Sequence, residues 1–161
     1  MTVHTRSALV LACVTLALAA PIASGQGDLD NTRIVFPADW FGHQDLYSVR
    51  PDGSDLRQLT HGSEWENHPS WSPDGTSLAF ASNRNGNGNW DIYTMNSDGT
   101  QVTQLTDNPS SDLEPVWSPD GARLAFTSNR NGVLEVFLID ISGRTVTATS
   151  QAGIPSDWRL G

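Results

Sequence analysis

The side chains best suited to chemistry in this sequence are two acids and a histidine that alternate along one short stretch. Glu64, Glu66 and His68 stand just before a Pro-Ser-Trp segment. Carboxylate and imidazole groups bind divalent cations, so the three could hold a metal ion if they converged. The histidines His43 and His61 add no compact ligand spacing. We therefore predict no metal and no cofactor, and keep a divalent ion at this stretch as an alternative.

Two further acids repeat this arrangement 46 residues later. Asp112 and Glu114 occupy the places of Glu66 and His68, again just before a proline and a tryptophan. A recurrence at the same place in two units indicates that these side chains lie at equivalent positions in the fold. We predict an acidic ring, the nearest thing in the sequence to a functional surface, formed by Glu64, Glu66, His68, Asp112 and Glu114.

A second candidate is the asparagine-rich segment 83–91. It has oxygen-bearing side chains at alternate positions and a glycine at its sixth position, as calcium-binding loops do. A calcium loop also needs an acidic first ligand and a glutamate at position twelve, where this chain has Asn83 and Thr94. We therefore predict a surface turn in which asparagine and glycine supply left-handed backbone conformations.

No catalytic motif is present in the sequence. It contains neither a nucleophile elbow, nor a Ser-x-x-Lys pair, nor a zinc-type His-Glu helix, nor a phosphate-binding glycine loop. Lysine is absent, and the serines and aspartates stand mainly in repeated turns. We predict that the protein is not an enzyme and that no residue is catalytic.

The charge balance is acidic. The chain has 9 basic and 18 acidic residues, a formal net charge of −9, and its arginines are scattered singly. Binding to nucleic acid requires clustered positive charge, so we predict no nucleic-acid partner. An acidic surface that aids solubility is the simpler interpretation, and a site for a basic partner is the alternative.

The first 25 residues have the composition of a cleavable secretory signal. A charged start containing His4 and Arg6 precedes an apolar stretch at 8–20 and a small-residue end at 23–25. The apolar stretch is shorter than a membrane span of ~20 residues, so we predict no membrane insertion and a periplasmic or secreted protein. The only cysteine, Cys13, lies inside this segment, which excludes a disulfide in the processed chain. A lipid anchor on Cys13 is an alternative.

The candidate residues are carried by a repeat of 46 residues. Segments 71–86 and 117–132 both read Trp-Ser-Pro-Asp-Gly-x-x-Leu-Ala-Phe-x-Ser-Asn-Arg-Asn-Gly. Apolar residues alternate over short runs and do not recur at the spacing of an amphipathic helix. A period in the forties is typical of a propeller blade. In the central unit we predict a tight turn at 72–75 and four strands, at 67–72, 77–82, 90–96 and 101–106.

The predicted fold class is therefore all-β: a β-propeller of four-stranded antiparallel blades, about three per chain, half of a six-bladed ring. We assign 1–25 to the signal peptide and 26–161 to propeller repeats. The blades fall at approximately 31–62, 66–107 and 113–150, with a partial strand at 153–158. The first blade lacks a first strand, while Ile154-Pro155-Ser156-Asp157-Trp158 resembles a surplus one.

The repeated string, followed by Asp91-Ile92-Tyr93 and Gln104-Leu105-Thr106, resembles the TolB-like β-propeller repeat family, the WD40-like repeats of exported bacterial proteins. The resemblance extends over roughly residues 31–158. It implies a six-bladed propeller in the periplasm, which in TolB stands behind a separate α/β domain and binds partners of the Tol-Pal system of the cell envelope. This sequence has no counterpart of that α/β domain and about half the blades. The fold and the location therefore carry over, and the partner does not.

Aromatic residues divide into two groups. Trp71, Trp117, Phe80 and Phe126 recur in register and are predicted to form the core. Trp40, Trp65 and Trp90 do not recur, and we predict that they form an exposed binding patch.

The leading hypothesis for function is an exported, non-enzymatic propeller module that mediates protein–protein interaction at the cell envelope. Its alternative is a propeller-based hydrolase or carbohydrate-acting protein whose polar channel carries the chemistry and could contain a metal. A truncated gene product without an independent role is a third. Because three blades leave sheet edges unpaired, we predict a head-to-tail homodimer in which Pro155–Trp158 of one chain completes the first blade of the other.

Overall fold

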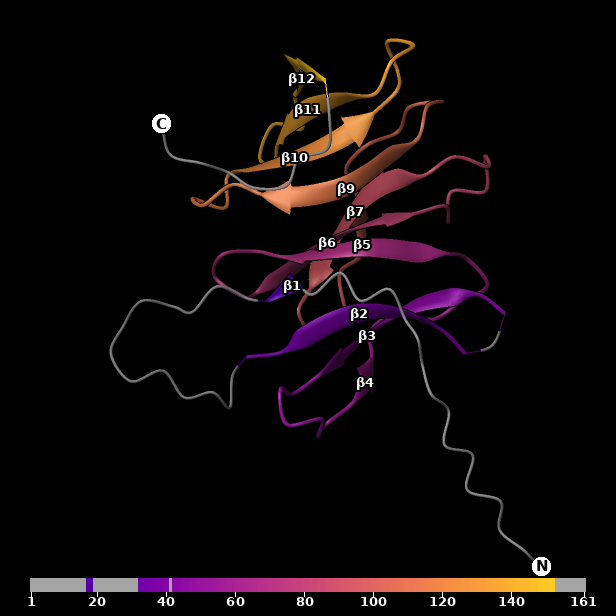
Figure 1. The fold of residues 1–161 in the computed structure, drawn as a ribbon, viewed down its shortest axis with the longest axis vertical. Helices are drawn as coiled ribbons and strands as arrows, with labels where there is room; N and C mark the ends of the chain where they lie inside the picture. The colour runs from indigo at the N-terminus through magenta and orange to yellow at the C-terminus, as the bar shows by residue number, and fades with distance from the viewer. Residues whose placement is uncertain (1–16, 19–31, 41, 153–161) are drawn as a thin grey trace, which may run out of the picture.

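The computed structural model describes residues 17–18, 32–40 and 42–152, which form three four-stranded antiparallel sheets (Figure 1). The first sheet contains β1 (Ala17–Leu18), β2 (Ile34–Asp39), β3 (Gln44–Val49) and β4 (Arg57–Gln58). The second contains β5 (Glu66–Trp71), β6 (Ser77–Ser82), β7 (Asp91–Asn96) and β8 (Thr103–Gln104). The third contains β9 (Asp112–Trp117), β10 (Arg123–Ser128), β11 (Glu135–Asp140) and β12 (Val146–Ala152). No helix occurs in this part of the chain, and hence none long and apolar enough to cross a membrane.

Each sheet is one blade, and the blades are stacked in chain order (Figure 1). Strands that follow one another in the sequence are neighbours in every sheet, as in a meander. This confirms the predicted fold class, an all-β protein built of about three four-stranded antiparallel blades. The predicted strand at 153–158 lies outside the described residues.

The inner three strands of the central blade agree with the predicted ranges to within one residue at each end. The outer strand β8 is shorter than predicted, with two residues in place of 101–106. Gln101 has a positive φ of 57°, which is incompatible with regular extended pairing, and the ladder begins at Thr103. Beyond Gln104 the regular pairing of β8 with β7 ends, because the backbone N–H groups of Leu105 and Thr106 both donate to one carbonyl, that of Ile92.

The turn between the first two strands of a blade is held by its own side chains. In the second blade, the carboxylate of Asp74 accepts hydrogen bonds from the hydroxyl of Ser72 at 2.6 Å and from the backbone N–H of Thr76 at 3.1 Å. Ser118 and Asp120 form the same bond at 2.6 Å in the third blade. The hydrogen bond from Ser72 is the main reason that the pKa of Asp74 is lowered. The predicted tight turn at 72–75 is therefore present, and its side-chain lock is repeated.

The first blade differs from its sequence interpretation. It was predicted to have no first strand, yet β1 pairs with β2 through Ala17 opposite Val35 and Leu18 opposite Ile34. Both β1 residues belong to the predicted signal peptide, which the sequence interpretation had excluded from the fold. The open edge of β2 presents backbone N–H and C=O groups that any extended segment can pair with, which is the physical reason for the difference.

The hydrophobic core lies between blades. One face of each blade packs on the opposite face of the next, and the two faces differ in character. The first junction buries Val35, Leu46 and Leu59 against Trp71, Leu78, Phe80, Tyr93 and Met95. The second buries Ala79, Ala81 and Ile92 against Leu124, Phe126, Phe137 and Ile139, with Trp117 partly buried beside them. Small and aliphatic side chains thus meet a larger, aromatic-rich face, and the four recurring aromatic residues lie in or against the core as predicted.

A glycine at the first junction offers a test of this packing. Gly99 has a φ of +87°, and a Cβ atom there would lie 2.4 Å from the carbonyl oxygen of Leu59 in the preceding blade. Gly53, its counterpart one blade earlier, has a φ of +82° and nothing within 4 Å of that position. We expect Gly53→Ala to cost about 1 kcal/mol of stability through backbone strain alone. Gly99→Ala should cost about 3 kcal/mol, because the clash is added. Urea unfolding of both variants checks this, and equal losses would contradict the close approach.

Candidate functional site

The polar groups that the fold brings together lie inside the blade junctions. At the first junction the hydroxyl of Thr60 is 3.3 Å from Asp45, on β3, and 3.1 Å from Glu66, on β5 of the next blade. The same hydroxyl accepts the backbone N–H of Leu46 at 2.8 Å. One threonine therefore joins a strand of its own blade to an acid of the next blade.

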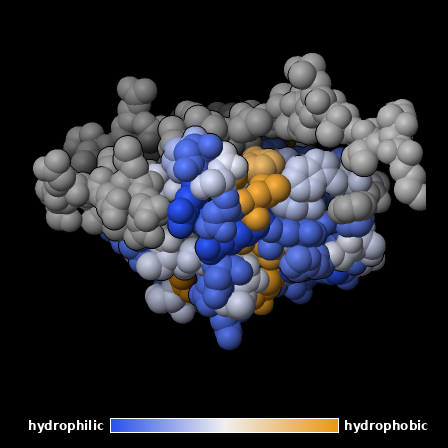
Figure 2. Space-filling view, turned by 90° about the horizontal axis from the view of Figure 1, so that it is seen from below, coloured by the Kyte–Doolittle hydropathy of each residue, from blue (hydrophilic) through white to orange (hydrophobic). Residues whose placement is uncertain are grey.

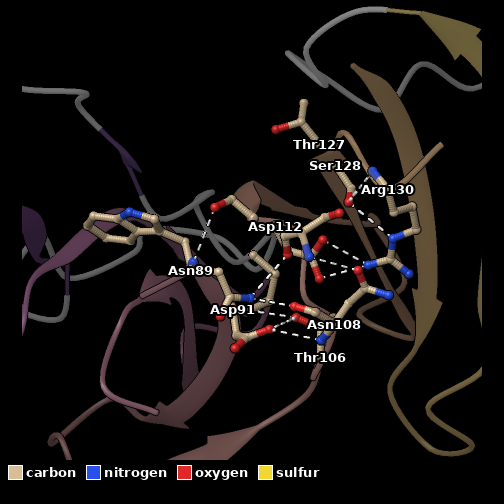
Figure 3. Close-up of polar contacts among 12 residues, drawn as sticks. Asn89, Asp91, Thr106, Asn108, Asp112, Thr127, Ser128 and Arg130 are labelled. Atoms are coloured by element: carbon tan, nitrogen blue, oxygen red, sulfur yellow. Dashed lines mark hydrogen bonds and ion pairs between the residues drawn. The ribbon is translucent and has the colours of Figure 1, made fainter. Parts of the chain in front are cut away.

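The second junction repeats this arrangement (Figure 3). Thr106 lies 3.4 Å from Asp91 and accepts the backbone N–H of Ile92 at 2.9 Å. Asp91 also accepts the backbone N–H of Asn108 at 3.4 Å. The backbone N–H of Asp112, the counterpart of Glu66, donates to the carbonyl of Trp90 at 2.8 Å, so the third blade is tied to the second. We call Asp45 and Glu66, and Asp91 and Asp112, the junction acids.

An arginine compensates the junction acid that begins each complete blade. Arg84 reaches Glu66 at 2.9 Å, and one nitrogen of Arg130 lies 2.8 Å from both oxygens of Asp112. A serine hydroxyl at the end of the second strand holds each guanidinium at 3.1 Å from its Nε atom. Because Glu66 is 2% exposed and Asp112 is fully buried, the ion pairs are largely screened from water.

The same arginines cover the aromatic core. Arg84 lies 5.1 Å from the ring centroids of both Phe80 and Tyr93. Arg130 lies 5.4 Å from Phe126 and 4.6 Å from the ring centre of its partner Phe137. A guanidinium over two rings gains cation–π attraction in addition to its ion pair. Each arginine therefore couples the apolar and the polar parts of one blade.

Burial raises the pKa of two of the junction acids, Glu66 and Asp91. Desolvation raises the pKa of Glu66 in spite of its contact with Arg84. Desolvation also raises the pKa of Asp91, and the neighbouring negative charges of Asp112 and Asp107 add to the effect. Raised pKa values in buried carboxyls can mark a catalytic acid. Here the carboxyls have their hydrogen-bond partners within the fold, which is the pattern of structural ion-pair networks.

The structure divides the predicted acidic ring. Glu66 and Asp112 lie inside the junctions, whereas the sequence interpretation placed them at a channel surface. Glu64 lies apart, and its carboxylate accepts bonds from the backbone N–H and the hydroxyl of Ser63, both at 3.0 Å. These bonds lower the pKa of Glu64. Across the part of the chain that the structure describes, no group of three histidine, cysteine or acidic side chains is arranged to hold a metal.

His68 and Glu114 remain together at the inner strands. They sit at matching bulges of β5 and β9, with φ angles of 51° and 56°. Burial lowers the pKa of His68, and the nearby charge of Glu114 offsets this in part. The Nδ1 atom of His68 is buried without a hydrogen-bond partner, while Glu114 lies 3.3 Å from the hydroxyl of Thr127. With Glu64, this pair is the part of the predicted ring whose side chains are not fully buried.

The three non-recurring tryptophans do not share one environment. Trp40 is 41% exposed and packs on Tyr47 at a centroid distance of 4.1 Å, with the rings tilted by 52°. Trp65 is 40% exposed, and its backbone N–H donates to the side chain of Asn83 at 2.9 Å. Trp90 packs, partly buried, against the core of the second junction. Two of the three are therefore available at the surface, and the third contributes to packing.

The asparagine-rich segment 83–91 is a turn, as predicted. The backbone N–H of Asn87 donates to the side-chain oxygen of Asn85, and that of Asn89 donates to the side chain of Asn87, both at 3.2 Å. The amide of Asn85 donates to Asp91, and that of Asn89 donates to the carbonyl of Asn108. Most of the oxygen-bearing side chains are thus engaged by the turn itself.

Sequence reasoning missed the residues that organise the junctions. Arg84 and Arg130 stand inside the repeated Ser-Asn-Arg-Asn-Gly string, and Thr60 and Thr106 end the repeated Gln-Leu-Thr string. Their recurrence at the period of the blade was the available signal. This recurrence indicates the repeated fold, but a polar residue that recurs at matching positions also indicates a recurring polar contact.

The ion pair of the third blade leads to a first prediction on stability. Arg130→Met leaves the carboxylate of Asp112 buried without its cation, which should cost about 3–5 kcal/mol of unfolding free energy. Arg57→Met is the control, because Arg57 pairs with Asp55 at the surface at 2.7 Å and should contribute less than about 1 kcal/mol. Chemical denaturation of both variants measures the difference. Equal effects would contradict a structural role for Arg130.

His68 leads to a prediction on pH. Its lowered pKa means that, below the ordinary value of about 6.5, the unfolded chain binds a proton that the folded chain resists. Stability is therefore complete above that pH and falls as the pH decreases through it. His68→Gln keeps a comparable side chain at the bulge and should flatten this part of the curve. Thermal melts from pH 7.5 to 5.5 compare the two proteins, and parallel curves would refute the assignment.

Comparison with known proteins agrees with the geometry. The TolB beta propeller domain family matches residues 86–156. A TolB homolog from Chlorobium luteolum is 44% identical over 57 residues, which cover 35% of this chain and 13% of that protein.

Solved structures extend the likeness to most of the described chain. TolB from Acinetobacter baumannii superposes with a TM-score of 0.68 at 27% identity, covering 78% of this chain and 31% of that one. A putative TolB from Agrobacterium tumefaciens gives a TM-score of 0.66 at 29% identity, covering 75% and 46%. A puromycin hydrolase, at 22% identity and a TM-score of 0.59, shares the fold. The chain spans less than half the length of these proteins, and its blades, repeats and matches make it similar to the TolB-like β-propeller family.

Proposed function

We propose that this chain is an exported, non-enzymatic module that binds protein through the outer faces of its first and third blades. The observation that carries the proposal is that both faces bear side chains of the kind that pack between blades. Ile34, Phe36 and Val49 on the first blade, and Val136 and Leu138 on the third, remain partly exposed. Figure 2, viewed from the first-blade end, shows hydrophobic residues among hydrophilic ones there.

The two outer faces correspond to the two sides of an internal junction. On the first blade, Ile34, Phe36 and Tyr47 hold the places of Leu78, Phe80 and Tyr93, because Phe36 pairs with Tyr47 as Phe80 pairs with Tyr93. On the third blade, Ala125, Thr127 and Val136 hold the places of Ala79, Ala81 and Ile92. Tyr47, Ala125 and Thr127 are themselves buried, so the partly exposed side chains are Ile34, Phe36 and Val49 at one end of the chain and Val136 and Leu138 at the other.

This complementarity favours a second copy of the chain as a partner. The third blade of one copy would pack on the first blade of the other as blades pack within the chain. Repeating the contact on the far side closes six blades into a ring, so the association stops at a dimer. The ring would also remove the exposed sheet faces that repeat units cannot leave uncovered.

Binding is favoured over catalysis by how the polar groups are used. The junction acids are engaged with arginine, threonine and backbone donors, and these include Glu66 and Asp91, the two whose pKa burial raises. The hydrolases among the structural neighbours share the fold alone. Export rests on the signal-like composition of residues 1–25, and the envelope location rests on the similarity to TolB.

Light scattering coupled to size exclusion tests the proposal. The exported chain should have twice the mass of its monomer, and Leu138→Asp should convert it to the monomer, because a charge would enter the packed face. Val102→Asp is the matched control, since Val102 is exposed on the middle blade and should leave the mass unchanged. A folded wild-type protein that stays monomeric at high concentration would rule out the dimer. A dimer that both variants leave intact would place the interface elsewhere.

A further inference from the structure

The inner edge of the first blade is incompletely paired. In the second and third blades the first strand is in register with the second over four residue pairs. In the first blade, β1 pairs with β2 over two, Ala17 with Val35 and Leu18 with Ile34. These two residues stand where Ser70 and Trp71 stand in the second blade, opposite Ala79 and Leu78. The end of a first strand is therefore in place, and its beginning has no counterpart among the described strands.

A buried indole marks the same position. Trp117 donates its Nε1 hydrogen to the carbonyl of Ser70, 3.1 Å away on the first strand of the preceding blade. Trp71 stands at the same place one blade earlier and is 9% exposed, and its Nε1 atom is buried without an acceptor. By register, the place of Ser70 falls to Ala17 of β1, but among the described residues no carbonyl accepts this N–H. An unsatisfied buried donor is costly, so a strand that supplies this carbonyl would be favoured.

The first blade also lacks the charge pair of its neighbours. Trp40 packs on Tyr47 as Arg84 packs on Tyr93, so tryptophan replaces the arginine that compensates a junction acid. A strand entering this blade with an acid at the place of Glu66 would bury a carboxylate without a cation, which is strongly unfavourable. The first blade therefore favours a first strand that has no acid at the place of Glu66.

We propose that the edge of β2 is a strand-binding slot that accepts the segment Ile154–Trp158 of a second copy, with a carbonyl of that segment accepting the indole N–H of Trp71. This deepens the proposed dimer and rests on it. The segment has the proline, serine and tryptophan of Pro69-Ser70-Trp71, with Asp157 inserted before the tryptophan. Ala152, three residues before the proline, stays paired with Glu135 in β12, so the segment enters the slot without an acid at the place that Glu66 and Asp112 hold in the other blades.

The occupant comes from another copy because the segment cannot reach the slot of its own chain. The described chain leaves the third blade at Ala152, the end of β12, and the first blade lies beyond the second (Figure 1). Packed sheets are about 10 Å apart, so two sheet spacings separate the outer blades. The two residues from Ala152 to Ile154 span at most about 7 Å. Removal of the signal-like segment would take β1 away and open the slot fully.

Two matched variants of the full exported chain test the slot. Trp71→Phe and Trp117→Phe each remove one indole N–H from equivalent positions. Only Trp71 is expected to donate across the dimer, whereas Trp117 donates within the chain. Sedimentation equilibrium over a dilution series should show dimer dissociation about a hundredfold weaker for Trp71→Phe, about tenfold for each of two slots. Trp117→Phe should lower the unfolding midpoint without a comparable change in dissociation.

The other outcomes separate this inference from the proposed function. A wild-type dimer whose dissociation changes equally in both variants overturns the slot and leaves the dimer standing. A wild-type monomer overturns both. If Trp71→Phe fails to fold, indole hydrogen exchange of the wild type replaces it. On dilution, faster exchange at Trp71 with no change at Trp117 supports the slot, and unchanged exchange at Trp71 overturns it. Deletion of residues 153–161 should reproduce the effect of Trp71→Phe on dissociation.

Discussion

The buried acid at each blade junction is the constraint on which the rest of this structure depends. A carboxylate removed from water must be paired, and the chain meets the requirement within one blade: Glu66 with Arg84, and Asp112 with Arg130. The arginine can reach its acid only because a serine at the end of the second strand and two aromatic rings hold it in place. Acid, serine, arginine and aromatic pair therefore recur together with the period of the blade.

The first blade departs from this pattern, and the same constraint explains why. The first blade has neither the acid nor the arginine. Trp40 packs on Tyr47, which belongs to the aromatic pair Phe36 and Tyr47, at the place that the arginine holds in the other blades. An arginine there would have no buried carboxylate to compensate, while an indole covers the rings and exposes an apolar edge. The blade at the start of the described arc is thus adapted to a different first strand from that of its neighbours. The unpartnered indole N–H of Trp71 points to the same conclusion from the other side of the junction.

Much of the fold could be predicted from the sequence because it depends on local signals that are repeated. Strand 77–82 and the turn at 72–75 follow from alternation and turn chemistry, and the 46-residue period gives the blade. The bulges at His68 and Glu114 could not be predicted, because their left-handed backbone depends on the ladder with the second strand. The pairing of Arg84 with Glu66, 18 residues apart, also depends on two strands meeting in space. The strand at Ala17–Leu18 was missed because composition assigned those residues to export.

The candidate site was harder to predict than the fold for a related reason. Acids just before a predicted first strand were interpreted as surface residues, but β5 begins at Glu66, which lies buried in the junction, whereas Glu64 precedes the strand and is not buried. The large hydrophobic side chains that stay exposed include Trp40 and Trp65, and the outer sheet faces add partly exposed ones. Side chains of the kind that pack between blades thus remain at the two ends of the described arc, and the proposed contact with another protein rests on them. The structural repeat supplies both sides of such a contact, which is why a second copy is the first partner to examine.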